Sequence, residues 1–403
     1  MRKNVLQLIG SFHQGGSERQ AVQLTRLLRE SGRYNVFVAT LNNSGPLAGE
    51  IANMGIDEVP EYRLTSFQDR NALVQGRRFA QYLRENDIDI VHSHDFYTNI
   101  FGMAAASVAR VRVRIASRRE SAVRAVKQRL IERGAYKLAH QVVANCDELR
   151  QQLIEKEGLR PDKVTTLYNG LDLSRIVARD VNSEKELLTS LGLPADQNRR
   201  FITIVANLRA HFTQPKPICL KDHPTFLRAA QRVRAAVPDA AFVIAGEGEL
   251  LEETRALARQ LGLEQDVFFL GSCQRVAELL SASTICVLSS TAEGFPNAIL
   301  EYMAAARAVV STDVGGAREA IEEGQSGYLV KSGDDETMAA RLVSLLNEPD
   351  KARAMGDRGR GIVKEKFSSE AQLARTQNLY ERLLARRTQS VPGTVGDVHR
   401  GNV

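Results

Sequence analysis

A chain of 403 residues is too long for one hydrophobic core, and it predicts two domains of roughly 150 to 200 residues each. Its composition, 43% hydrophobic and 25% charged, is that of a globular protein and excludes a disordered chain. No apolar run approaches the ~20 residues that cross a bilayer, and a strand-like segment follows the first residues at once. We therefore expect a cytoplasmic protein.

Charge and cysteine content narrow the class further. The four cysteines, Cys146, Cys219, Cys273 and Cys286, fit no metal-ligand spacing, so we expect free thiols in a reducing compartment. The net charge of +6 is uneven, because residues 1–171 hold 25 Lys and Arg against 18 Asp and Glu, whereas the rest of the chain holds 29 against 30. The excess positive charge therefore belongs to the first half.

Short apolar segments alternate with amphipathic ones along the whole chain, which predicts βα units and parallel sheets. The first series of expected strands is Val5 to Ile9, Val36 to Leu41, Ile88 to His92, Arg112 to Ala116, Val142 to Ala144 and Val164 to Leu167. The second series is Phe201 to Val205, Phe242 to Ala245, Val267 to Leu270, Ile285 to Leu288, Val309 to Thr312 and Tyr328 to Val330. Open parallel sheets bind ligands beyond the carboxyl ends of their strands, so we expect the chemistry in the loops that follow the strands.

A turn and a polar stretch separate the two series. The Asn-Gly turn at residues 169–170 begins this stretch, which runs to Arg200. We therefore expect an N-terminal domain over 1–171 and a C-terminal domain over 172–367. Helical periodicity over 368–387 predicts a last helix that packs back on the first domain, and we expect a disordered tail over 388–403.

A pair of glycines follows the first strand. Gly15 and Gly16 precede an amphipathic helix, and Ser17 with Gln20 predicts a capping box at its start. Glycines before a helix let backbone N–H groups approach a phosphate, and the helix dipole favours the negative charge. A plain tight turn is the alternative interpretation.

A sharper pattern follows the fourth strand of the second series. Gly294 and Pro296 keep Glu293 out of a helix that begins at Pro296 or Asn297, and Glu301 then lies on the second turn of that helix. Carboxylates placed in this way can accept hydrogen bonds from the hydroxyls of sugar rings. Helix capping and a solvated helix face are the alternative.

With these motifs in order over nearly the whole chain, the sequence resembles the retaining glycosyltransferases of family four, the group 1 family. The resemblance implies the GT-B fold, an α/β architecture in which two Rossmann-like domains with parallel sheets face one another across a cleft. It implies that Glu293 binds donor-sugar hydroxyls near the reacting face and that Glu301 binds the ribose of the nucleotide. The segment 304–316 continues the family pattern, with Ala306 and Ala308 in place of the usual Gly and Pro.

The resemblance implies further contacts to the donor. It places the glycine pair beside the donor phosphates and His94, in preference to His92, in the cleft as a catalytic residue; a structural role is the alternative for this histidine. It places the loops at 245–248 and 269–271 at the nucleotide and its base, and each of these loops can also be a simple strand-to-helix turn. The residues expected to bind the donor are Gly15, Gly16, Gly246, Glu247, Leu270, Gly294, Phe295, Pro296, Asn297 and Glu301.

Relatives in this family hold the donor diphosphate with an Arg and a Lys. Lys221 matches the family Lys through the segment Lys-Asp-His-Pro, and Arg209 is the candidate Arg, with Asn207 as the other residue that can occupy its position. Eleven residues, 210–220, separate the two motifs, and we expect them to form an inserted loop. The residues expected to take part in catalysis are thus Glu293, His94, Lys221 and Arg209.

The resemblance implies transfer of a sugar, with retention of configuration, from a UDP- or GDP-sugar to a glycan or lipid-linked acceptor. It places the protein in the synthesis of cell-surface polysaccharide or glycolipid and implies neither a cofactor nor a bound metal. A UDP-sugar 2-epimerase of the same fold and a non-catalytic sugar-nucleotide-binding protein are the alternatives.

One basic segment predicts a surface contact. Residues 110–137 carry ten Lys and Arg against two Glu, a density that attracts anionic lipid at about 1 kcal/mol per nearby charge. We expect docking on the inner face of the plasma membrane; an anionic glycan, or no partner, is the alternative. We expect no nucleic-acid partner, because the sequence has no aromatic interleaving or recognised binding motif. The cations expected to contact acceptor or membrane are Arg118, Arg119, Arg124, Lys127, Arg129 and Arg133.

Overall fold

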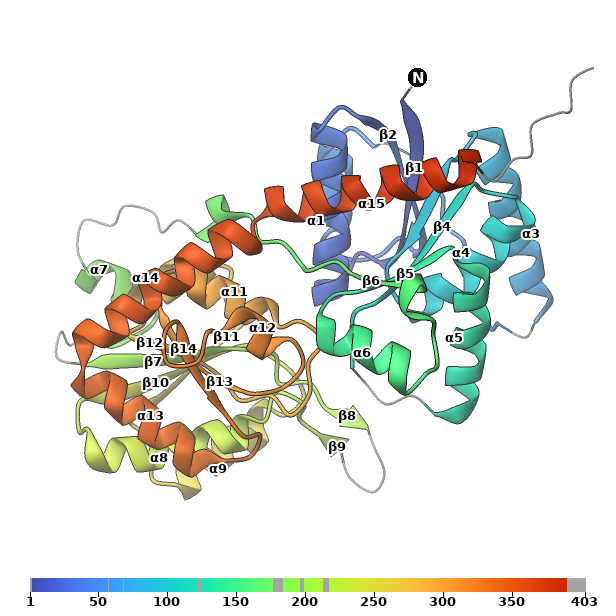
Figure 1. Cartoon of the computed structure of the whole chain (residues 1–403). Coiled ribbons are helices and arrows are strands. Elements are labelled where there is room, and N and C mark those ends of the chain that lie inside the picture. The colour runs from blue at the N-terminus through green and yellow to red at the C-terminus, as the bar shows by residue number, and fades with distance from the viewer. Residues whose placement is uncertain are drawn as a thin grey trace, which may run out of the picture. The chain divides into compact units, whose positions relative to one another are not determined.

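The protein is described by a computed structural model over residues 2–56, 58–67, 69–121, 125–176, 184–195, 199–212 and 217–389. Within these residues the chain forms two six-stranded sheets and one two-stranded sheet, with helices on both faces of each large sheet (Figure 1). The predicted α/β class with two parallel sheets is confirmed.

The first sheet has the strand order β2-β1-β3-β4-β5-β6, and β1 pairs in parallel with both β2 and β3. Each strand of the first predicted series is found. Their bounds are β1 (Lys3–Ser11), β2 (Tyr34–Asn42), β3 (Ile90–Ser93), β4 (Val113–Arg118), β5 (Gln141–Ala144) and β6 (Val164–Thr166). The helices of this part of the chain are α1 (Gly16–Glu30), α2 (Ala48–Asn53), α3 (Arg70–Glu85), α4 (Phe96–Val108), α5 (Val126–Leu138) and α6 (Asp147–Glu155), with short 3-10 helices η1 (Pro161–Lys163) and η2 (Leu173–Ile176).

The second sheet has the order β11-β10-β7-β12-β13-β14, and it contains each strand of the second predicted series. Its strands are β7 (Arg200–Val205), β10 (Ala240–Ala245), β11 (Val267–Gly271), β12 (Ile285–Leu288), β13 (Ala308–Thr312) and β14 (Gly327–Val330). The helices are α7 (Glu184–Ser190), α8 (His223–Ala236), α9 (Leu251–Gln260), α10 (Val276–Ala282), α11 (Asn297–Ala304), α12 (Ala317–Ala320), α13 (Asp335–Asn347), α14 (Pro349–Lys366) and α15 (Ser369–Gln389).

Strand alternation explains how the second sheet builds its core. In β7, Ile202 and Ile204 pack into one buried cluster, with Phe226 of α8, whereas their neighbour Phe201 packs into a cluster on the opposite face with Val243 of β10. Successive side chains of a strand point to opposite faces, so a strand covered by helices on both faces must be apolar throughout. This is why these strands read as unbroken apolar runs.

The inserted segment contains a short hairpin. Strands β8 (His211–Phe212) and β9 (Pro217–Ile218) pair antiparallel, and residues 213–216 between them lie outside the described part of the chain. A two-residue strand carries little apolar signal, so sequence reasoning assigned only a loop here.

One predicted helix start is wrong in detail. Helix α1 begins at Gly16 with Gly15 as its N-cap, so Ser17 lies inside the helix and the capping box expected from Ser17 and Gln20 does not form. A glycine with φ −80° and ψ 162° occupies the cap position instead. The two glycines thus lie at the N-terminus of the helix, as the sequence predicted.

The contacts of the chain divide it into two compact units, each described below by itself. The first unit holds residues 1–118, 125–143 and 373–403, and the second holds 119–124 and 144–372. Most of α15 therefore belongs with the first unit; the tail expected over 388–403 falls, from residue 390, outside the described residues. The boundaries predicted from the sequence stay a prediction.

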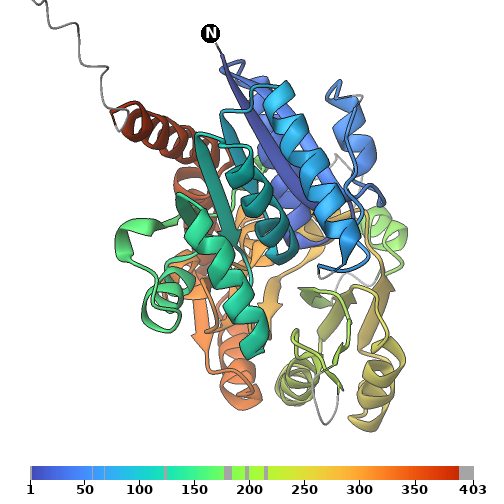
Figure 2. The ribbon, with the colours of Figure 1, turned by 90° about the vertical axis from the view of Figure 1, so that its right-hand side faces the viewer.

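In the first unit, α4 contacts α3 on one side and α5 on the other, as Figure 2 shows for the blue to green helices.

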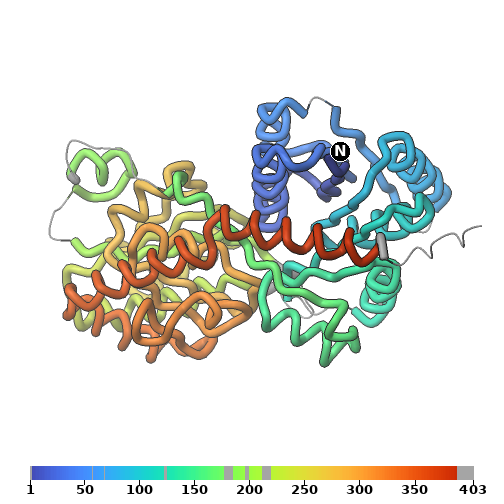
Figure 3. Tube along the Cα trace, turned by 45° about the horizontal axis from the view of Figure 1, so that its top comes forward, coloured from blue at the N-terminus to red at the C-terminus, as the bar shows by residue number. Residues whose placement is uncertain are grey.

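Asp95, directly after His94, caps α4: its carboxylate accepts hydrogen bonds from the N–H groups of Tyr97 and Thr98, at 2.9 and 3.0 Å. The cap ends the strand-to-helix turn at Asp95 and fixes the backbone beside His94. The red helix α15 can be followed in Figure 3.

Candidate active site

An ion pair in the second unit joins two predicted catalytic residues. Nζ of Lys221, just before α8, lies 2.5 Å from Oε1 of Glu293, in the loop after β12. The hydroxyl of Ser290 donates to the same carboxylate oxygen at 2.6 Å. Both charged side chains keep some exposure, 26% for Lys221 and 13% for Glu293. The two motifs, 72 positions apart in sequence, therefore meet at one point.

The loop after β12 also holds the backbone that carries Lys221. The Ser289 hydroxyl donates to the carbonyl of Lys221 at 2.8 Å, and the Thr291 N–H donates to the carbonyl of Leu220 at 2.8 Å. These bonds tie the end of the 210–220 segment, and with it Lys221, to the loop after β12. Sequence reasoning missed the three hydroxyl residues; the available signal was polar side chains directly after a buried apolar strand.

Helix α11 begins at Asn297 with Pro296 as its N-cap. Glu293 therefore lies before the helix and Glu301 on its second turn, half-buried, as the glycine and proline positions predicted. The first helical N–H groups and the two carboxylates belong to one short stretch of chain. An arrangement of this kind offers both hydrogen-bond acceptors for hydroxyls and a positive dipole for a phosphate.

Glycines after β13 press against this stretch. The N–H of Gly316 donates to the carbonyl of Gly294 at 2.8 Å, and a Cβ on Gly315 would lie 2.3 Å from that oxygen. Gly315 also has a φ of 55°, which side-chain-bearing residues rarely adopt. The thiol of Cys146 donates to the same carbonyl at 3.6 Å, and burial raises its pKa to about 12, so it stays a thiol.

Two predicted donor residues face protein in the structure. The ring of Phe295 is buried and packs against Tyr168 and Phe367, with centroids 5.3 and 5.1 Å apart. The side chain of Asn297 accepts a hydrogen bond from Asn169 at 2.8 Å. The side chain of Phe295 therefore serves packing, and a donor contact at this residue is left to its backbone.

The loop with the candidate arginine pairs with the loop after β10. Leu208 donates its N–H to the Glu247 carbonyl at 3.0 Å, and a Cβ on Gly246 would come within 1.9 Å of the Ala206 carbonyl oxygen. The glycine is needed because the two backbones approach so closely. Asn207, Arg209 and Glu247 are all exposed on these loops. Which of Asn207 and Arg209 takes the family position stays open.

His223 adds no charge beside Lys221. Burial, with a further contribution from the Lys221 cation, lowers the pKa of His223 to about 4, so the ring is neutral at pH 7. Its Nδ1 lies 3.4 Å from the sulfur of Cys219. The ammonium is therefore the cation that this segment contributes to the site.

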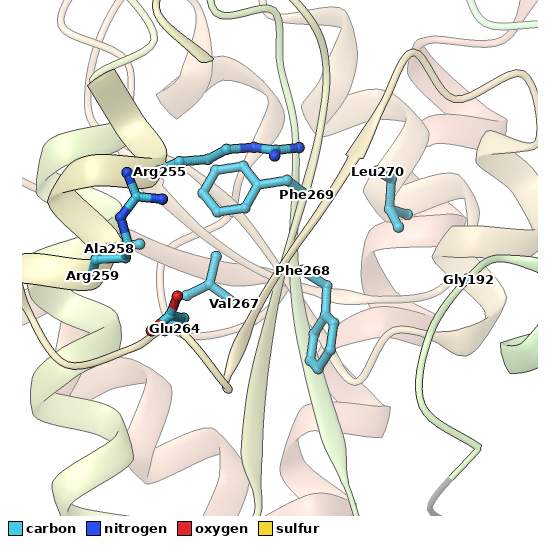
Figure 4. A pocket seen from close by; sticks show the side chains of 9 residues that line it. All are labelled: Gly192, Arg255, Ala258, Arg259, Glu264, Val267, Phe268, Phe269 and Leu270. Carbon is cyan, nitrogen blue, oxygen red and sulfur yellow. The ribbon is translucent and has the colours of Figure 1, made fainter. Parts of the chain in front are cut away.

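Leu270 lies apart from the residues above. It lines a pocket of about 310 Å³ beside the edge strand β11, with Phe268 and Phe269 on the strand and Arg255 of α9 above the Phe269 ring (Figure 4). None of the other residues predicted to bind the donor lines this pocket. The structure therefore does not bring the Leu270 side chain to the ion pair.

In the first unit, His94 is buried, with 1% of its surface exposed, and its Nε2 lies 2.7 Å from Oε1 of Gln7. Gly15 and Gly16 stand at the N-terminus of α1. These three are the predicted catalytic and donor-binding residues that the first unit contributes.

The predicted basic surface is only partly exposed. Arg118 is not on the surface, because it is 5% exposed and pairs with the fully buried Glu132 at 2.6 Å. Arg119 is half-buried and donates to Asn169 at 3.0 Å. Arg124 lies outside the described residues. The exposed cations of the predicted set are Lys127, Arg129 and Arg133 of α5.

Exposed apolar side chains accompany these cations on α5. Val126, Leu130 and Ile131 are 63%, 65% and 41% exposed.

Within the described part of the chain, no helix is both long and apolar enough to span a membrane. The same residues contain no group of three or more His, Cys, Asp or Glu arranged to hold a metal ion.

Two family models match the chain in order. Residues 14–175 match the model described as Glycosyltransferase Family 4, and residues 220–361 match the one described as Glycosyl transferases group 1. The second match contains Lys221, Glu293 and Glu301.

Curated relatives carry transferase and synthase names. The N-acetyl-alpha-D-glucosaminyl L-malate synthase of Bacillus anthracis is 30% identical over 56% of this chain and 55% of its own length. The UDP-Gal:alpha-D-GlcNAc-diphosphoundecaprenol alpha-1,3-galactosyltransferase of Escherichia coli is 26% identical over 66% of this chain and 68% of its own. The chain spans about half the length, 37% to 56%, of several such relatives.

A solved structure shows the same fold. Anabaena Alr3699/HepE in complex with UDP matches 95% of this chain and 100% of its own with a TM-score of 0.81, at 19% sequence identity. The two family matches, which follow one another over most of the chain, show that it belongs to the group 1, family 4 glycosyltransferases, and the structural likeness shows that it has the GT-B fold.

Proposed function

We propose that this protein transfers a sugar from a nucleotide-diphosphate sugar to a glycan or lipid-linked acceptor, with retention of configuration. The observation that carries the proposal is the meeting of Lys221 with Glu293, directly before the N-terminus of α11. A departing diphosphate needs positive charge and N–H dipoles, and a sugar ring needs carboxylate acceptors. The ion pair and the helix N-terminus supply all of these in one place.

The two oxygens of the Glu293 carboxylate differ in their hydrogen-bond partners. Both Lys221 and Ser290 donate to Oε1, and among the described residues none donates to Oε2. Oε2 is therefore the acceptor left for a donor-sugar hydroxyl. An ammonium has three N–H donors, so Lys221 can hold Glu293 with one and phosphate oxygens with the others.

We propose a UDP-sugar as the first donor to test, because the E. coli relative is named for UDP-galactose. The same name gives a diphosphoundecaprenol-linked sugar as its acceptor and supports a lipid-linked acceptor here.

We also propose that no metal takes part. An Asp-x-Asp triplet at 87–89 precedes β3, and its Asp89 forms ion pairs with Lys3 and Arg112 at 3.6 and 3.5 Å, which gives this carboxylate a structural role.

The test separates the two carboxylates. Glu301→Ala is expected to weaken UDP binding, whereas Glu293→Gln lowers turnover and leaves UDP binding close to wild type, because only Glu301 is assigned to the nucleotide. Loss of a charged hydrogen-bond partner costs about 1.5 to 3 kcal/mol, roughly 10- to 150-fold. Isothermal titration with UDP and steady-state kinetics measure the two effects.

Wild-type values in both variants would overturn the site. Release of UDP measured with and without acceptor distinguishes transfer from the alternatives, because a 2-epimerase releases UDP without an acceptor and a binding protein releases none.

We propose further that α5 docks the protein on an anionic membrane surface. Helix α5 exposes both cations, such as Lys127, Arg129 and Arg133, and apolar side chains, such as Val126, Leu130 and Ile131, and this combination suits the boundary between head groups and acyl chains. Exposed charges are screened over about 8 Å at physiological ionic strength, so docking should weaken as salt rises.

Changing Lys127, Arg129 and Arg133 to Gln is expected to abolish co-sedimentation with anionic liposomes. Leu130→Ser should weaken it at constant charge, because an apolar contact with the bilayer is lost. Changing three exposed cations of α14, Arg353, Arg360 and Lys364, to Gln is the charge-matched control and should leave binding intact. Equal binding by all variants would exclude docking through α5.

A further inference from the structure

A hydrogen-bonded network of buried side chains lies in the interior of the first unit. Its members come from three neighbouring strands, from the end of β3 and from α15, and each is at most 1% exposed. They are Ser117, His92, Tyr380, Gln7 and His94. Buried polar groups that satisfy one another hold each other in a defined orientation.

Four hydrogen bonds connect the five side chains. Nε2 of His92 lies 2.9 Å from the Ser117 hydroxyl, and Nδ1 of His92 lies 2.8 Å from the Tyr380 hydroxyl. The Gln7 amide nitrogen donates to that hydroxyl at 3.1 Å, and its carbonyl oxygen lies 2.7 Å from Nε2 of His94. Tyr380 is therefore the residue at which the branch to His92 and the branch to Gln7 join.

The fold explains why these residues meet. Gln7 of β1 lies opposite His92 of β3 in the parallel register, and the rings of His92 and His94 stack with centroids 4.5 Å apart. Tyr380 follows His92 by 288 positions, and its ring packs edge-on against the His92 ring at 5.9 Å. A residue from the last helix thus completes a network begun by the first and third strands.

The order of donors and acceptors sets a tautomer. The Gln7 amide group donates to Tyr380, so the Gln7 carbonyl oxygen must accept from His94, which requires the proton on Nε2 of His94. The Tyr380 hydroxyl, which accepts from Gln7, is also hydrogen-bonded to Nδ1 of His92, and that bond fits either tautomer of His92. A neutral imidazole with its proton on Nε2 is an acceptor at Nδ1.

We propose that Tyr380 is a positioning residue which, through Gln7, holds the His94 ring in the Nε2-protonated form that sugar transfer uses. The proposal rests on the proposed function, because it gives His94 a part in the reaction. Tyr380 itself contacts Gln7 and His92 and acts only through them.

Tyr380→Phe removes the hydroxyl and keeps the ring. Without that acceptor, the Gln7 amide can reverse and donate to His94, so the nitrogen-15 spectrum of the His94 ring should change from one tautomer to a mixture. Turnover is expected to fall about tenfold, equivalent to 1.36 kcal/mol, with KM for the UDP-sugar within about twofold of wild type.

Tyr34→Phe is the matched control. Tyr34 is also buried and packs edge-on against the Tyr380 ring at 5.8 Å, but among the described residues its hydroxyl has no hydrogen-bond partner. This variant should keep the wild-type His94 spectrum and turnover. A second check combines Tyr380→Phe with His94→Ala, where the tyrosine change should have no further effect on turnover.

An unchanged His94 tautomer in Tyr380→Phe would overturn the proposal, as would equal losses in both tyrosine variants or independent losses in the double variant. The spectrum is recorded without substrate. If the wild-type protein transfers no sugar, the proposed function fails, and the spectrum still decides whether Tyr380 sets the tautomer.

Discussion

Lys221→Met is expected to lower turnover about 10- to 150-fold and to weaken UDP binding, because one charge-assisted hydrogen bond of this kind contributes about 1.5 to 3 kcal/mol. Methionine keeps the length of the side chain and removes the ammonium that lies against Glu293. The loss should appear both in UDP titration and in turnover, because the proposed role of the cation includes the departing diphosphate.

Lys364→Met is the control for this change. Lys364 is exposed on α14, so the same substitution there should leave kinetics and UDP binding as in wild type. If Lys221→Met also behaves as wild type, a different cation holds the diphosphate, and Arg209 is the next residue to change.

Arg118→Met is expected to destabilise the protein by about 3 to 5 kcal/mol, because it leaves the fully buried Glu132 carboxylate without its guanidinium partner. For a unit of this size the melting temperature should fall by roughly 6 to 20 °C. Calorimetry is the suitable measurement because it can resolve separate transitions in a chain with two compact units.

Two variants separate the buried charge from the loss of packing. Arg118→Met combined with Glu132→Leu removes both charges and should recover most of the lost stability. Arg112→Met breaks an ion pair with Asp89 in which the arginine is 43% exposed, and it should cost less than about 1 kcal/mol. Equal effects of Arg118→Met and Arg112→Met would show that the buried pair contributes no more than a surface pair.

The elements that the sequence predicted well are those with a local signal. The core strands are apolar because helices cover both faces, and Gly294 with Pro296 stops any helix from including Glu293. The position of Lys221 was also predictable, since its four-residue motif survives the insertion.

The features that were missed depend on partners that lie beyond the local sequence pattern. Arg118 belongs to a dense run of basic residues and was assigned to the surface, but it is buried and forms an ion pair with the buried Glu132. Phe295 sits between motif residues and was assigned to the donor, but Tyr168 and Phe367 enclose its ring. Periodicity and motif spacing carry no information about which distant side chain will be the neighbour.

The bond between Gln7 and Tyr380 joins residues 373 positions apart, and this has a consequence for synthesis of the protein on the ribosome. At about 5 to 20 residues per second, Tyr380 is made roughly 20 to 75 s after Gln7. During that time the first sheet has left the exit tunnel, yet the buried polar groups of Gln7 and His92 still await their partner. The first unit therefore completes its native interior only after α15 has been made, and truncated chains that lack α15 should be degraded by proteases faster than chains that contain it.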